Sequence, residues 1–186
     1  MIGGDIIQVF TVSGKAQHGK DTVANLLYEE LHNAGERVII THYADLLKFI
    51  CKQYFSWDGQ KDENGRGLLQ YVGTDVIRNQ CPDFWVDFVI DILKLFNKEW
   101  DWVIIPDTRF TNEIERLREE GFKVSHLRVE RPAYNSNLTK EQQAHPSETA
   151  LDDVIPDELI VNDGSIDDLR CKIQKLLTRY THEENK

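Results

Sequence analysis

The amino-acid sequence predicts an α/β fold built on a parallel sheet. Apolar, β-branched runs of strand length alternate along the chain with longer stretches of helical periodicity. A strand at 7–12, a helix at 20–34 and a strand at 37–43 have the spacing of a right-handed βαβ unit, which makes the two strands parallel. Later strands are predicted at 102–106, 123–129 and 158–161.

The first strand leads into a glycine-rich loop of the P-loop type. Gly14 is followed by four residues and then by Gly19 and Lys20, after which helical periodicity begins. Glycine permits turns that a Cβ forbids, so successive N–H groups converge on an anion at the positive end of the helix. Lys20 adds a mobile charge for the β- and γ-phosphates, on the order of 4 kcal/mol at close range. Spacing, strand and helix together favour a phosphate site over a glycine-rich turn that binds no ligand.

One position of this loop departs from the usual pattern. Asp21 follows the lysine, where Ser or Thr normally contacts Mg²⁺, and Thr22 comes next. A carboxylate beside a triphosphate is repulsive unless a metal ion or its waters lie between them. Asp21 is therefore either a ligand of Mg²⁺, with the Thr22 hydroxyl on a phosphate, or a residue that complements the helix dipole.

Composition and charge narrow the class of partner. With 186 residues, 40% of them hydrophobic and 29% charged, the chain suits a single globular domain, 1–186. The net charge of −10 argues against binding to a nucleic-acid polymer and favours a small anion held by a few cations and Mg²⁺. No apolar run approaches the roughly 20 residues of a membrane span and no signal peptide is evident, so we expect a cytoplasmic protein that contacts no membrane. The three scattered cysteines fit a reducing compartment.

Residues 44–100 are predicted to form a helical insertion without a strand. Three helices, at 44–54, 68–79 and 84–100, are expected there, with a polar loop at 56–67. An insertion at the carboxyl side of a parallel sheet is where a second substrate binds. The candidates for contact with this substrate are Asp45, Lys48, Gln70, Thr74, Arg78 and Trp85. For each of them taken alone, a place on the solvated surface or in the core is a better explanation than a role as a ligand.

The strand at 102–106 delivers a carboxylate to the edge of the sheet where the P-loop lies. Asp107 follows it directly, at the place of the acidic residue that holds Mg²⁺ in P-loop proteins. Arg109, two residues further, is within reach of a phosphate. The alternative is that Asp107 caps the helix predicted at 112–120.

Residues 130–151 form a long polar segment that contains prolines and lacks periodicity. Loops of this length in a compact domain are usually functional or disordered, so we expect a lid that excludes water and supplies cations, with Arg131 the best placed. His145 and Glu148 resemble a metal-binding pair, but two ligands on a loop favour ordinary polar residues. A last helix is predicted at 166–180, followed by a disordered tail, 181–186.

The motifs of this chain, taken in their order along the sequence, resemble those of phage-type deoxynucleoside monophosphate kinases. The similar segments run from about residue 8 to residue 178 and are GKAQHGKDT, YADLLK, LLQYVGTDVIR, PDFWV, DTRFTNE, VERP, HPSETALDD and NDGSIDDL. The P-loop alone is not specific to this family, whereas the GKDT variant followed by DTRF is much more so. The resemblance implies the P-loop NTPase fold, a three-layer α/β/α sandwich with a five-stranded parallel sheet. It also implies transfer of the γ-phosphoryl group of ATP, with Mg²⁺, to a deoxynucleoside monophosphate.

The resemblance assigns roles to residues of this chain. The residues it places on ATP, besides Gly14 of the loop, are Lys15, Gly19, Lys20, Asp21, Thr22 and, at the adenine, Asn162 and Gly164. Those that face the metal, the transferring group or the lid are Asp107, Arg109 and Arg131. Those that border the monophosphate are Lys48, Gln70, Thr74, Arg78 and Trp85.

Two other functions stay open on the sequence alone. A kinase of another small phosphorylated metabolite, such as phosphomevalonate, shares a similar loop and architecture. A nucleotide-dependent switch uses a P-loop without transfer, but this chain has no NKxD-type guanine signature and has an insertion suited to an acceptor. The preferred bases, the exclusion of ribonucleotides and the formation of a homodimer are not fixed by the sequence.

Overall fold

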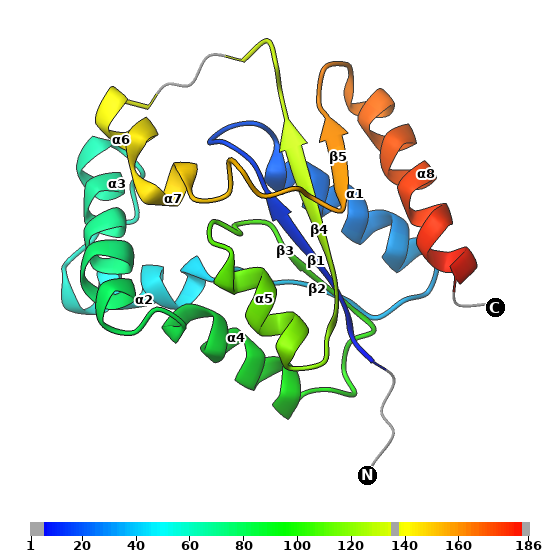
Figure 1. Ribbon diagram of the computed structural model, residues 1–186, viewed down its shortest axis with the longest axis horizontal. Helices are drawn as coiled ribbons and strands as arrows, with labels where there is room; N and C mark the ends of the chain where they lie inside the picture. Colours follow the sequence, from blue (N-terminus) through cyan, green and yellow to red (C-terminus); the bar gives the residue numbers. More distant parts are fainter. Residues whose placement is uncertain (1–5, 135–137, 184–186) are drawn as a thin grey trace.

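The computed structural model describes residues 6–134 and 138–183, and the side chains up to residue 180. Five parallel strands form one sheet in the order β2-β3-β1-β4-β5 (Figure 1). In chain order they are β1 Gln8–Ser13, β2 Val38–Ile40, β3 Trp102–Ile105, β4 Lys123–Glu130 and β5 Glu158–Val161. The five-stranded parallel sheet expected from the sequence is confirmed.

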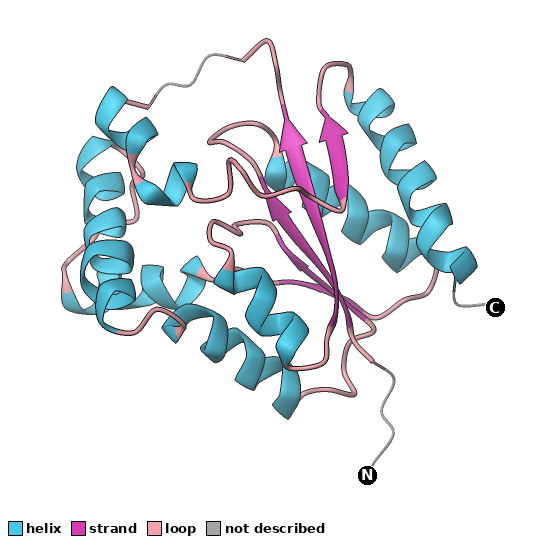
Figure 2. Ribbon diagram, in the orientation of Figure 1, coloured by secondary structure: helices cyan, strands magenta, loops and turns pink. Residues whose placement is uncertain are grey.

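Helices cover both faces of the sheet (Figure 2). Helices α1 (Lys20–Asn33) and α8 (Ile166–Glu183) bury their apolar stripes against one face, in a core that includes Phe10 of β1. Helices α4 (Phe84–Leu95) and α5 (Asn112–Glu119) pack on the other face, where Val9 belongs to a second core. Adjacent residues of β1 thus enter opposite cores, as the period of a strand requires. The three-layer α/β/α sandwich is confirmed.

The carboxyl ends of the central strands bring the site together. Strand β1 pairs Thr11 with Ile105 of β3 and Ser13 with Arg128 of β4. The chain therefore leaves β1 into the P-loop, β3 toward Asp107 and β4 toward Arg131 at one edge of the sheet. This is the edge at which open α/β sheets bind ligands.

The insertion differs in detail from the prediction. Helix α2 covers Ala44–Tyr54 as expected, but α3 (Glu63–Gln70) begins within the predicted polar loop. It begins there because the Asp62 carboxylate accepts the N–H of Gly65 at 2.8 Å and caps the helix. The chain continues as a π-helix, η1 (Tyr71–Arg78), and α4 ends at Leu95 rather than near residue 100. A small core of Cys51, Trp57 and Val72 holds the insertion together.

Three further boundaries also differ. Strand β2 is shorter than predicted and only half-buried, because it lies at the edge of the sheet. The segment after β4 contains two short helices, α6 (Lys140–Ala144) and α7 (Pro146–Thr149). Helix α8 continues to Glu183, so the expected tail at 181–186 is helical at its start, and 184–186 lie outside the described residues together with 1–5 and 135–137. Within the described part of the chain, no helix is both long and apolar enough to span a membrane.

Candidate active site

The two P-loop glycines occupy positions that a side chain could not. Gly14 has φ +141°, and a Cβ there would lie 2.3 Å from the carbonyl oxygen of Val129. Gly19 has φ +98°, and its Cβ would lie 2.6 Å from Nδ2 of Asn162. Both the left-handed backbone and the close neighbours therefore require glycine.

Lys20 is held at the mouth of this loop. Its Nζ donates to the carbonyl oxygens of Gly14 at 2.9 Å and Lys15 at 3.0 Å, and the residue is only 8% exposed. Burial, followed by the positive charge of Arg109, lowers the pKa of Lys20 to about 8. The ammonium group is therefore charged at neutral pH and closer to titration than a surface lysine.

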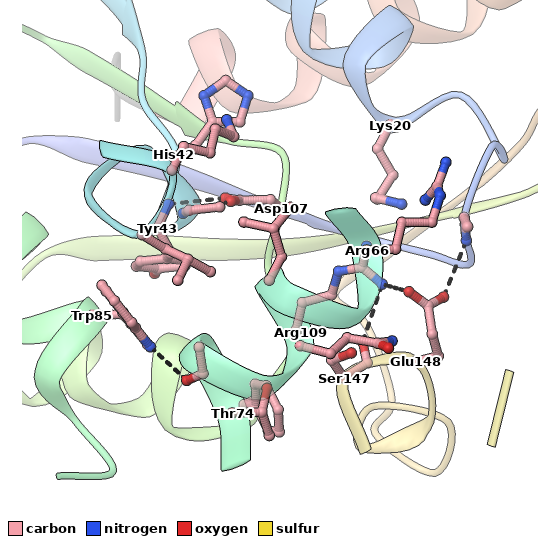
Figure 3. Close-up of a pocket in the computed structure, with 18 of the residues that line it drawn as sticks. Lys20, His42, Tyr43, Arg66, Thr74, Trp85, Asp107, Arg109, Ser147 and Glu148 are labelled. Atoms are coloured by element: carbon pink, nitrogen blue, oxygen red, sulfur yellow. Dashed lines mark hydrogen bonds and ion pairs between the residues drawn. The ribbon is translucent and has the colours of Figure 1, made fainter. Parts of the chain in front are cut away.

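Asp107 caps a different helix from the one that the sequence suggested. Its Oδ1 accepts the N–H of Tyr43 at 3.0 Å and its Oδ2 the N–H of Ala44 at 2.9 Å, at the start of α2 (Figure 3). Helix α5 instead has Thr111 at its N-cap. The alternative that Asp107 caps α5 is therefore wrong, and its role as a ligand of Mg²⁺ stays a prediction. The carboxylate fixes the start of the insertion to the end of β3, and each of its oxygens keeps a further acceptor position.

One cavity of about 400 Å³ collects the predicted acceptor residues and the predicted transfer residues except Arg131, which is not part of its lining. Lys20, Asp21, Asp107 and Arg109 line it. From the insertion it is lined by all the candidates implied by resemblance, namely Lys48, Gln70, Thr74, Arg78 and Trp85. Arg66 of α3, which was not predicted, adds a cation beside Lys20 and Arg109 (Figure 3).

Several of these side chains already have partners. Lys48 pairs with Asp45 at 2.8 Å, and buried Trp85 donates from Nε1 to the carbonyl oxygen of Gly73 at 3.0 Å. Arg78 stacks on the ring of Phe110, 3.9 Å from its centroid. The hydrogen bond from Trp85 of α4 to Gly73 of η1 anchors the π-helix to α4.

Most of the other predicted nucleotide residues lie around a second cavity of about 440 Å³, whereas Gly14 and Lys15 line a third of about 340 Å³. The second cavity is lined by Gly19, Lys20, Asp21, Thr22, Arg131, Asn162 and Gly164, among others. The Asn162 amide donates to the carbonyl oxygen of His18 at 3.0 Å, so β5 shapes the P-loop. Arg131 lies over the ring of Tyr134 at 5.0 Å, and its backbone N–H donates to Nδ1 of His18 at 3.2 Å. The fold thus brings Asn162 and Gly164, which the resemblance places on ATP, to one cavity with Arg131, which it places in the lid.

Glu148 of α7 contacts the P-loop directly, a role that the sequence did not reveal. Its carboxylate accepts the N–H of Ala16 at 3.2 Å and pairs with the guanidinium of Arg109 (Figure 3). Lys15 donates to the Glu148 carbonyl at 2.6 Å and to Asp152 at 2.5 Å. Since P-loop N–H groups and nearby cations are the groups that bind phosphate, this carboxylate lies where an anion is expected.

A metal pair of His145 and Glu148 is not formed. The His145 Nδ1 accepts the N–H of Ser147 at 3.2 Å and caps α7, while Glu148 faces Arg109. Among residues 6–134 and 138–183, no group of three or more His, Cys, Asp and Glu side chains is arranged to hold a metal ion.

The parallel five-stranded sheet, the glycine-rich loop and the buried lysine define a P-loop α/β protein. The dephospho-CoA kinase of Campylobacter jejuni shares this fold, with a TM-score of 0.53 and 14% identity over 92% of this chain and 96% of that chain. The deoxynucleotide monophosphate kinase family model matches residues 45–173. This chain belongs to the deoxynucleotide monophosphate kinase family.

Two phage proteins are similar in sequence. The deoxynucleotide monophosphate kinase of Enterobacteria phage T4 is 40% identical over 114 residues, and that of Escherichia phage RB69 is 33% identical over 114 residues. Each alignment covers 60% of this chain but only 44% of the phage protein. The matched region is thus less than half the length of these relatives.

Proposed function

We propose that this protein transfers the γ-phosphoryl group of ATP to a deoxynucleoside monophosphate, giving ADP and the diphosphate. The observation that carries the proposal is the shared cavity: Lys20 and Arg109, at the P-loop, face the same space as Arg78 of the insertion. Phosphoryl transfer needs two phosphates in line between cations, and little covalent chemistry from the protein. A cavity with the P-loop at one wall and Lys48, Arg66 and Arg78 of the insertion at the other fits that need.

The named residues have distinct tasks in this proposal. Lys20 and the loop N–H groups bind the β- and γ-phosphates, while Arg109 neutralises charge on the transferred group. Arg78, Lys48, Gln70, Thr74 and Trp85 orient the acceptor, whose phosphate is ionised at neutral pH and needs no strong base. Asn162 and Gly164 border the adenine, and Arg131 supplies a cation from the end of β4.

Mg²⁺ fits the donor set of the cavity. Asp21 and Asp107 both line it, and carboxylate oxygens completed by water and phosphate are the ligands that Mg²⁺ prefers. When bound, the ion would be held by Asp21 and Asp107 and would neutralise charge on the phosphates. We also propose that the protein is cytoplasmic, in the cytoplasm of the host cell if a phage encodes it, a location that the two phage relatives support.

The test is steady-state ADP formation with Mg·ATP and each of dAMP, dCMP, dGMP, dTMP and their ribose counterparts. We expect turnover with one or more deoxynucleotides, and the pattern of rates reads out the base pocket. Turnover with phosphomevalonate but with none of the nucleotides would show that the acceptor is another phosphorylated metabolite. Tight ATP binding with no transfer to any acceptor would favour a nucleotide-dependent switch.

A further inference from the structure

Glu113 of α5 lines the same cavity as the predicted acceptor residues, although it lies outside the set of predicted site residues. Its side chain is only 2% exposed, although it carries a carboxylate. A buried charge is costly unless it is paired and hydrogen-bonded, so the partners of Glu113 show what it is for.

Each carboxylate oxygen of Glu113 has a separate set of partners. Oε1 forms an ion pair with Nη2 of Arg78. Oε2 accepts the backbone N–H of Arg109 at 2.7 Å and of Phe110 at 3.1 Å. The Glu113 carbonyl accepts the hydroxyl hydrogen of Tyr43 at 2.8 Å. One buried residue thus connects the π-helix, the loop after β3 and the start of α2.

The guanidinium of Arg78 is fixed on several sides by this arrangement. Besides Glu113, it donates from Nη1 to Asn112 and to the carbonyl oxygen of Pro82, each at 3.1 Å, and it stacks on Phe110. These hydrogen bonds use three of its five N–H groups. The remaining two have no partner among residues 6–134 and 138–183, so they can bind an anion in the cavity that Arg78 lines. Because a planar guanidinium recognises phosphate through its fixed donors, its orientation decides what it can bind.

We infer that Glu113 is a positioning residue of the acceptor site: through Oε1 its carboxylate orients the Arg78 guanidinium toward the acceptor phosphate. The inference rests on the proposed function. A purely structural role is the competing explanation, because a glutamate in the first turn of a helix commonly reaches back to the preceding N–H groups. That role employs Oε2 alone, whereas Oε1 is committed to Arg78.

A double-mutant cycle separates the two explanations. Glu113→Gln keeps the volume of the side chain but removes its charge, and Arg78→Met removes the guanidinium. We expect each variant to raise the KM for the monophosphate on the order of tenfold, with the KM for ATP changed less than twofold. The KM of the double variant for the monophosphate should be raised no more than that of Arg78→Met alone, since the two residues act as one unit. Glu115→Gln, at an exposed position of the same helix, is the matched control and should resemble the wild type.

The outcomes distinguish this inference from the proposed function. A wild type that phosphorylates no monophosphate overturns the proposed function and with it the acceptor site. If the wild type is active but the effects of Glu113→Gln and Arg78→Met on the monophosphate KM are additive, only the role of Glu113 is overturned. The same holds if Glu113→Gln raises the KM for ATP as much as the KM for the monophosphate. If Glu113→Gln fails to fold, Glu113→Asp replaces it: aspartate keeps the charge, but its shorter side chain cannot reach Arg78 and the N–H of Arg109 together. A raised monophosphate KM then supports the inference, and an unchanged one contradicts it.

Discussion

Lys20 is the residue on which the P-loop depends most directly. It is nearly buried and donates to two loop carbonyls, so a polyphosphate meets a preorganised cation rather than a flexible one. We expect Lys20→Met to lower turnover on the order of 10²–10³, as when one preorganised donor is lost from an active site. Lys175→Met, at an exposed site on α8, is the control. An unchanged rate for Lys20→Met in the ADP-release assay would refute the P-loop assignment.

The lowered pKa of Lys20 also predicts a pH dependence of nucleotide binding. With a pKa of about 8 in the free protein, the ammonium loses its proton as the pH rises through 8, and the attraction to phosphate is lost with it. If only the charged form binds, ATP affinity should fall about tenfold from pH 7 to pH 9. Titration calorimetry at both pH values measures this. Lys20→Met has no charge to lose, so an equal fall in that variant would assign the effect to another group.

At the residue scale, the sequence located the loop and the cations but not the acids that hold them. Spacing alone identifies Gly14, Gly19 and Lys20, because their chemistry is local. The contact of Glu148 with Ala16 joins residues 132 positions apart, and no local pattern encodes such a distance. Glu113 did leave a signal: it lies four residues before Leu117 on the buried face of α5, where a charged side chain needs a partner.

At the scale of elements, α7 holds the P-loop through a carboxylate that competes with phosphate. The Glu148 side chain is 8% exposed and takes a P-loop N–H and the Arg109 guanidinium, so a nucleotide must displace it to use those groups. Glu148→Gln weakens this hold by removing the charge. We expect ATP affinity to increase about fivefold, because binding no longer bears the cost of displacement. Glu141→Gln, exposed on α6, is the control, and weaker ATP binding by Glu148→Gln would show that the carboxylate assists the nucleotide instead.

The P-loop turn itself can be tested with a pair of glycines that differ in one property. Gly14 and Gly35 both have positive φ, but a Cβ at Gly14 would meet the Val129 carbonyl at 2.3 Å, whereas nothing lies within 4 Å of a Cβ at Gly35. We expect Gly35→Ala to cost about 1 kcal/mol of stability and to leave ATP binding intact. Gly14→Ala should lose ATP binding by more than tenfold, since the loop must move away from β4. Equal affinities in calorimetry would contradict the geometry.

Element boundaries were predictable where local chemistry decides them. Helix α2 begins and ends as predicted, and Gly35 ends α1 close to the expected residue. The start of α3 was missed because Gly65 and Gly67 lie in a sequence that reads as a turn, yet the cap of Asp62 and packing against Trp57 outweigh that propensity. The π-helical form of η1 depends on contacts with α2 and α4 that no local pattern contains.

At the scale of the whole molecule, the parallel sheet followed from the sequence, whereas the strand order did not. One βαβ spacing and five apolar runs predict parallel strands, and the convergence of Gly14, Asp107 and Arg131 at one edge follows from that. The placement of β1 between β3 and β4 depends on which apolar surfaces pair across the chain. Such long-range pairing has no signature within a single strand.

His126 connects the stability of the whole sheet to pH. It lies in β4 and is 1% exposed, with its Nε2 2.7 Å from the Ser13 hydroxyl of β1. Burial, followed by the charge of Arg128, lowers the pKa of His126 to about 4. The folded protein therefore keeps the ring neutral at pH values where an unfolded chain, with a histidine pKa near 6.5, takes up a proton.

Acidification should therefore destabilise the fold through His126. Because the unfolded state binds more protons between pH 6.5 and 4, the free energy of unfolding falls as the pH falls through that window. From pH 7 to pH 5 the wild type should lose about 2 kcal/mol more than His126→Gln, whose amide can still bond Ser13 but does not titrate. Urea unfolding at both pH values measures the difference, with His32→Gln, exposed on α1, as the control. Equal losses in wild type and His126→Gln would mean that the buried ring accepts a proton in the folded sheet as readily as in the unfolded chain.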